Sequence, residues 1–145
     1  MKNILFICLA FATLLSAVAA DGPDDSKALQ GTWIPVKGEL GGQPMADVIL
    51  KTITLKLTKG DYEVTVTGAG TDAGTWAVDS AAQPKGMTIK GVQGPNAGKT
   101  FPAIYELKTD TLRICYDLSG AKRPAEFKTT AGTKLYLVTY NRKTP

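Results

Sequence analysis

Residues 52–67 read TITLKLTKGDYEVTVT, and this stretch decides the fold. Apolar side chains occupy every second position on both sides of the turn Lys59-Gly60-Asp61: Ile53, Leu55, Leu57, Tyr62, Val64 and Val66. Because alternate side chains of a β-strand point to the same face, each half reads as a half-buried strand. The stretch therefore predicts a β-hairpin with one apolar and one polar face.

The same period of two recurs along the chain, and almost nothing follows a helical period. Further strands are predicted at 31–40, around Trp76 and Val78, around Met87 and Ile89, and over 100–107, 111–118 and 133–143. Two short helical turns are expected, one capped by Asp24 or Asp25 and one that begins with Pro44, and we expect them to plug the barrel ends. Eight short strands in series close most readily into an up-and-down antiparallel barrel, since closure leaves no unpaired edge.

The first twenty residues, MKNILFICLAFATLLSAVAA, are typical of a cleaved export signal. Lys2 precedes an apolar run that is too short for an ordinary membrane-spanning helix, and small residues end the segment. We expect cleavage after Ala19 or Ala20, a flexible segment over 21–28 and one barrel domain over 29–143. No later stretch reaches the roughly eighteen apolar residues of a spanning helix. The sequence therefore predicts a secreted or periplasmic protein without membrane insertion.

The charges of the mature chain are nearly balanced. Without Lys2, 16 basic residues stand against 13 acidic ones, and both signs are interspersed. We therefore expect no nucleic-acid partner, because such a partner requires a basic stripe or patch. Lys122-Arg123-Pro124 is open to two interpretations, an anion site or a basic loop at the barrel rim.

Cys115 is the only cysteine after the export signal, so no internal disulfide is expected. Strict alternation places Cys115 on the outer face of its strand. Two interpretations stay open for this side chain, a small buried apolar group or a reactive, dimer-forming thiol.

The chain contains no histidine, which removes the usual general base and the commonest metal ligand. Its glutamates are scattered and do not predict an acid and base pair. GPNAGKT at 94–100 resembles the end of a phosphate-binding loop, but only three residues separate its glycines, and Pro102 forbids the helix that should follow. We expect a protein that is not an enzyme, with no catalytic residue, no metal site and no cofactor.

The tripeptide Gly-Thr-Trp occurs at 31–33 and again at 74–76, and it contains both tryptophans. Glycine lets the backbone bend into a strand, and an inward tryptophan two residues later can cover the end of a small barrel. We expect Trp33 to be such a plug. The second Gly-Thr-Trp is expected to reflect the same bend, because its flanking residues show no repeat.

Gly31-Thr32-Trp33 resembles the GxW signature of lipocalin-like barrels, in which an arginine of the last strand covers the tryptophan. Arg142 occupies the matching place. Residues 29–142 also resemble a family of extracellular domains of planctomycete bacteria, through LQGTW, Pro84-Lys85, Gly94-Pro95, Gly98-Lys99, Ile104-Tyr105, Leu112, Cys115-Tyr116, Arg123-Pro124 and Phe127. The resemblance implies a barrel fold, an exported location and a structural pair Trp33 and Arg142, and it implies no activity.

Two functions of different kinds are compatible with these features. The first is a binding barrel whose interior holds a small apolar or amphipathic molecule. Its expected lining is the inward-facing set Leu55, Leu57, Val64, Val66, Trp76, Ile89, Tyr105, Ile114 and Tyr116. The second is a protein-interaction module, an inhibitor or envelope-associated partner, that acts through the loops 68–74, 94–99 and 119–124. A hollow interior favours the first function and a filled interior favours the second.

Overall fold

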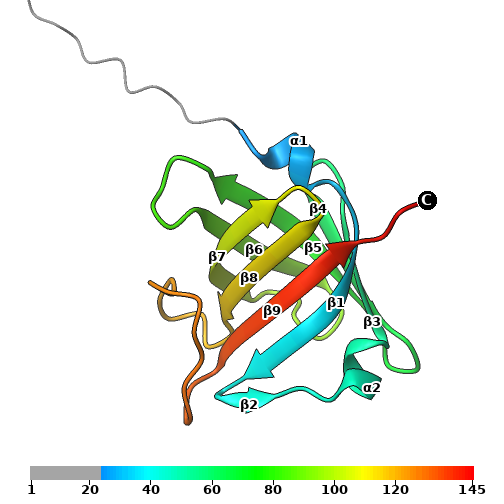
Figure 1. The fold of residues 1–145 in the computed structure, drawn as a ribbon, viewed down its shortest axis with the longest axis vertical. Helices are drawn as coiled ribbons and strands as arrows, with labels where there is room; N and C mark the ends of the chain where they lie inside the picture. The colour runs from blue at the N-terminus through cyan, green and yellow to red at the C-terminus, as the bar shows by residue number, and fades with distance from the viewer. Residues whose placement is uncertain (1–23) are drawn as a thin grey trace, which may run out of the picture.

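The computed structural model describes residues 24–145, which form an antiparallel β-barrel (Figure 1). Its strands are β1 (Gly31–Leu40), β2 (Gln43–Pro44), β3 (Ile53–Leu57), β4 (Asp61–Val66), β5 (Gly70–Asp79), β6 (Gly86–Gln93), β7 (Thr100–Lys108), β8 (Thr111–Asp117) and β9 (Leu135–Arg142). From β3 to β9 each strand pairs with its neighbours in sequence, and β1 pairs with both β3 and β9. The predicted all-β, eight-stranded up-and-down barrel is confirmed, and the two-residue β2 extends it beside β1.

The two ends of the barrel differ. At one end lie the β3–β4, β5–β6 and β7–β8 turns together with α1 (Ser26–Leu29), and we call it the closed end. Leu29 and Trp33 are fully buried there. The other end, the open end, carries the β1–β3 connection, the β4–β5 turn, the β6–β7 loop and the long β8–β9 segment. An antiparallel meander of even strand number sorts its connections in this way because each strand reverses the chain.

The core follows the period of two that the sequence shows. Buried inward side chains come from every strand of the barrel except β2, and they meet in one apolar cluster. The alternation of β1 changes at Val36, which has no partner in β9 although Pro35 and Lys37 both do. This bulge turns Leu40 and Gly38 inward, whereas Trp33 and Pro35 face inward before it.

Both helices are short. α2 (Asp47–Leu50) packs on β1, where Leu50 approaches Gly38. Pro44 does not begin this helix, because it lies in β2 opposite Glu39 and Ala46 is the cap residue. With four residues each, neither helix of the described chain is long enough to cross a membrane.

The segment before β1 is attached to the barrel. Residues 24–28, part of the segment expected to be flexible, form a turn and the start of α1. Asp25 does not cap α1 through its side chain, because its carboxylate binds Lys85 at 2.6 Å and Tyr105 at 2.8 Å. The predicted export signal at 1–20 lies outside the described residues.

The two Gly-Thr-Trp tripeptides use glycine for different reasons. Gly31 has φ +139°, and a Cβ there would lie 2.8 Å from Nη1 of Arg142. Gly74 has no positive φ, so the expected shared bend is wrong for the second copy. Gly74 is instead needed because a Cβ would collide with the carbonyl of Lys90 beside a bulge in β6.

Candidate functional site: a cavity at the open end of the barrel

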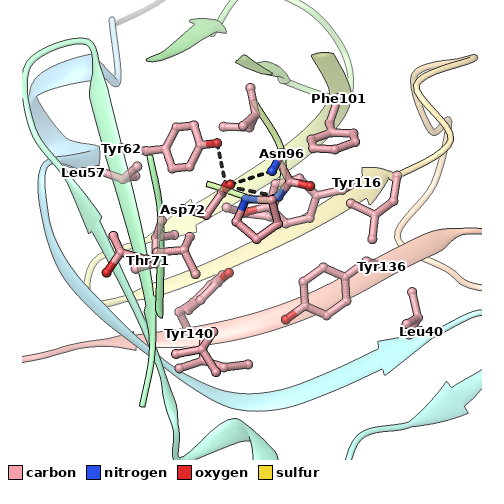
Figure 2. Close-up of a pocket in the computed structure, with 18 of the residues that line it drawn as sticks. Leu40, Leu57, Tyr62, Thr71, Asp72, Asn96, Phe101, Tyr116, Tyr136 and Tyr140 are labelled. Carbon is pink, nitrogen blue, oxygen red and sulfur yellow. Dashed lines mark hydrogen bonds between the residues drawn. The ribbon is translucent and has the colours of Figure 1, made fainter. Parts of the chain in front are cut away.

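A cavity of about 400 Å³ occupies the open half of the barrel (Figure 2). Its walls come from eight strands, every one except β2, and from the connections at the open end, including the loop between β6 and β7. The rim includes the exposed residues Ala69, Gly70, Thr71 and Pro95, so the cavity opens to solvent at this end. The volume lies within the range of about 300 to 1,000 Å³ that is usual for small-molecule sites.

Seven of the nine residues predicted to line a pocket do line this cavity: Leu55, Leu57, Val64, Val66, Ile89, Ile114 and Tyr116. Trp76 and Tyr105 do not. The Trp76 indole N–H donates to the carbonyls of Thr58 and Asp61 at 2.9 Å each, which places its ring at the closed end. The Tyr105 hydroxyl bonds to Asp25 and to Ser80 at the same end. The prediction was wrong for these two residues because the alternation of apolar side chains tells which face of the sheet a residue is on, but not how far along the barrel it lies.

The cavity also has wall residues that the prediction omitted. The polar and aromatic ones are Tyr62, Thr71, Asp72, Asn96, Phe101, Tyr136 and Tyr140. The alternation that places Trp76 inward also places Gly74 and Asp72 inward, so the sequence carried a signal for Asp72. Tyr136 and Tyr140 alternate in the same way with Val138 on β9. The sequence carried no such signal for Leu40. Alternation from Trp33 would place Leu40 on the outer face, and only the bulge at Val36 turns it inward.

Asp72 is the centre of a hydrogen-bonded group at the mouth of the cavity. Its carboxylate accepts hydrogen bonds from the Tyr62 hydroxyl at 2.8 Å, from the Asn96 backbone N–H at 2.9 Å and from the Asn96 side-chain amide at 3.1 Å. Figure 2 shows these three contacts, together with Tyr116, Tyr136 and Tyr140, which line the same cavity. They fasten the β6–β7 loop to β5, so that Pro95 and Asn96 become part of the wall.

The tyrosines of the wall present neutral hydroxyl groups in an apolar setting. Burial raises the pKa of Tyr136 to about 12, and it raises the pKa values of Tyr62, Tyr116 and Tyr140 further above their ordinary range. The Tyr116 and Tyr136 rings stack with centroids 5.7 Å apart. At neutral pH the wall therefore combines aliphatic surface, aromatic rings and un-ionised hydroxyls.

The closed end is sealed by the pair that the sequence indicated. The Arg142 guanidinium carbon lies 4.2 Å from the centroid of the Trp33 ring, so the expected stacked contact is present. The guanidinium also donates to the carbonyls of Gln30 at 2.7 Å and Ala28 at 2.8 Å, and to the Asp110 carboxylate at 3.0 Å. The Trp33 indole N–H donates to the Leu29 carbonyl at 2.9 Å. These bonds satisfy carbonyls at the end of α1 and hold the helix over the barrel.

The residues between β8 and β9 cover the outside of the barrel. Cys115 faces outward as alternation predicts, but it is fully buried, with Sγ 3.8 Å from the Lys128 carbonyl. Burial raises the pKa of its thiol, which favours the inert interpretation. The Arg123 guanidinium donates to the carbonyls of Met87 and Ala103 at 2.7 and 2.6 Å, so it holds the segment to β6 and β7.

The described residues contain no group of three or more acidic or sulfur side chains placed to hold a metal ion. Two of the scattered glutamates have partners of their own: Glu39 bonds to Thr129, and Glu106 pairs with Arg113 and Lys108. Comparison with protein-family models, curated proteins and solved structures finds no match for this chain. The function therefore has to be argued from the cavity itself.

Proposed function

We propose that this protein is an exported binding protein that holds a small apolar or amphipathic molecule in the barrel cavity. The observation that carries the proposal is the cavity of about 400 Å³. A barrel of eight strands can be filled entirely by its own side chains, and this one is not. The apolar wall of a cavity that opens to solvent is in contact with water, which is unfavourable, and an apolar ligand removes that surface from water.

The export signal at 1–20 belongs to the same proposal. Its composition supports a function outside the cytoplasm, where a soluble carrier meets sparingly soluble molecules. Amino-terminal sequencing of the exported protein is expected to begin at Ala20 or Asp21. An exported form that keeps Met1, or that carries a lipid on its first residue, would contradict this part.

Binding can be tested with N-phenyl-1-naphthylamine, a neutral probe whose fluorescence rises in apolar surroundings. We expect saturable binding of one probe per chain. Val64→Trp places a large side chain in the cavity wall and is expected to weaken binding at least about tenfold. Thr65→Trp is the matched control, because Thr65 is the next residue of β4 and does not line the cavity. Equal binding by both variants, each with a native circular dichroism spectrum, would exclude the cavity as the site.

One surface feature favours the second candidate, a protein-interaction module. Val48 and Ile49 of α2, which lies in the β1–β3 connection at the open end, are 71% and 50% exposed. Of the loops expected to form the interface, residues 70–74 belong to β5, and Arg123 binds 119–124 to the barrel. Native mass spectrometry of the protein purified from its own organism separates the candidates, because it detects a retained small molecule or a bound protein.

A further inference from the structure

The cavity has an unusual distribution of charge. Among its lining residues in the described chain, Asp72 is the only one with an ionisable carboxyl group, and none is a lysine or arginine. The rest of the wall is aliphatic, aromatic, hydroxyl or amide. A ligand with an anionic head would meet this carboxylate without a compensating positive charge, so the electrostatics disfavour fatty acids and similar anions.

The charge of Asp72 has no cationic partner. Its three hydrogen-bond donors, the Tyr62 hydroxyl and two N–H groups of Asn96, are all neutral. None of the ion pairs found in residues 24–145 includes Asp72. A half-buried carboxylate against an apolar wall attracts a cation more strongly than one in bulk water does, because the local dielectric is lower.

The aromatic residues of the wall add a second attraction for a cation. Tyr116, Tyr136 and Tyr140 line the cavity that Asp72 borders, and Tyr62 bonds to Asp72 directly. The faces of aromatic rings are electron-rich and draw ammonium groups that lie within about 6 Å of a ring centroid. The phenols are protonated at neutral pH, and burial raises their pKa values further, so their rings and hydroxyl oxygens are available as neutral contacts.

We propose that the ligand of the cavity is an amphipathic organic cation, an amine with an aliphatic or aromatic body. Its ammonium group lies at Asp72 among the tyrosines, and its apolar body lies along Leu55, Val64, Ile89 and Ile114. This inference rests on the proposed binding function and specifies the chemical class of the ligand. A cavity of about 400 Å³ accommodates an octyl chain with its head group.

Asp72 has a second role in the structure, since it fastens the β6–β7 loop through Asn96. The test must therefore remove the charge and keep the loop. Asp72→Asn does so, because its remaining carbonyl oxygen still accepts a hydrogen bond from the Asn96 backbone. Glu63→Gln is the matched control, as it removes one negative charge from the neighbouring strand at an exposed position outside the cavity.

The experiment is calorimetric titration of the exported chain with octylammonium, octanol and octanoate, which share one chain and differ in the charge of the head. We expect octylammonium to bind at least about tenfold more tightly than octanol, and octanoate to bind most weakly. In Asp72→Asn the preference for octylammonium over octanol is expected to fall below about threefold, with octanol affinity unchanged within about twofold. Glu63→Gln should leave all three affinities as in the wild type.

The outcomes separate the two proposals. Octanol binding as tightly as octylammonium, or a cation preference that survives Asp72→Asn, overturns the cationic ligand and leaves the binding barrel standing. Failure of all three compounds, together with failure of N-phenyl-1-naphthylamine, overturns the binding function itself. The wild-type series needs no variant, so the inference stays testable if Asp72→Asn does not fold.

Discussion

At the scale of single residues, Trp33 and Arg142 form a stacked pair at the closed end of the barrel, and both donate hydrogen bonds to backbone carbonyls. The indole is fully buried, and its ring lies under a guanidinium that also binds two backbone carbonyls near the end of α1. Neither residue lines the cavity. The pair is therefore a structural lock at the end of the barrel opposite the proposed site.

Trp33→Ala is expected to lower the free energy of unfolding by about 3 to 5 kcal/mol, because it leaves a large void and releases α1. Arg142→Lys is expected to cost about 1 to 2 kcal/mol, since lysine keeps the charge but loses the planar stack and most of the hydrogen bonds. Urea denaturation followed by tryptophan fluorescence measures Arg142→Lys, and circular dichroism measures both variants. The folded Arg142→Lys variant should bind N-phenyl-1-naphthylamine as the wild type does. Loss of binding in that variant would contradict a purely structural role.

At the scale of elements, the long β8–β9 segment has no strand of its own and is held by side chains. Arg123 reaches across to two carbonyls of neighbouring strands, Met87 of β6 and Ala103 of β7. The Arg113 guanidinium lies 4.0 Å from the centroid of the Phe127 ring, and Thr129 bonds to Glu39. These contacts bury Cys115 and hold the segment against the outer face of the barrel.

Arg123→Ala is expected to destabilise the protein by about 1 to 3 kcal/mol, because two backbone carbonyls lose a charged donor. It should also raise the reaction rate of Cys115 with a thiol reagent such as dithionitrobenzoate, as the covering segment opens. Lys122→Ala removes the same charge from the adjacent exposed position and is expected to change stability by less than about 0.5 kcal/mol. Similar thiol reactivity in the two variants would show that Arg123 does not hold the segment.

At the scale of the whole molecule, all five tyrosines of the chain have raised pKa values in the folded state, with burial as the largest cause. A phenol that holds its proton more tightly when folded contributes stability that is fully present below its unfolded pKa of about 10. That contribution is lost as the pH rises through the folded pKa, which is about 12 for Tyr136.

The native protein is therefore expected to show little tyrosinate absorbance at 295 nm up to about pH 11, whereas the chain unfolded in guanidinium titrates near pH 10. Stability should fall as the pH rises from about 10 to 12. A native titration curve that coincides with the unfolded one would contradict the burial of the tyrosine cluster.

The sequence by itself determined the class of fold, the strand order and the face of most side chains. Alternation over 52–67 and its repeats require a barrel-like sheet, because only closure pairs every edge and buries one face. Seven wall residues and the contact between Trp33 and Arg142 followed from that alternation and from the resemblance.

Only the tertiary structure decided three things: how deep each inward side chain lies in the barrel, where β1 exchanges its inward and outward faces, and how much of the interior stays unfilled. Trp76 and Tyr105 share the inward face with the wall residues but lie toward the closed end, where turns and α1 supply their partners. The bulge at Val36 turns Leu40 inward, although alternation from Trp33 would place it outside. The cavity is the space that these side chains leave unfilled. The alternation of apolar residues in the sequence contains no information on the volume of that space. The role proposed for the Asp72 carboxylate also depends on the tertiary structure. Strands and loops far apart in the sequence decide which charged side chains lie near it.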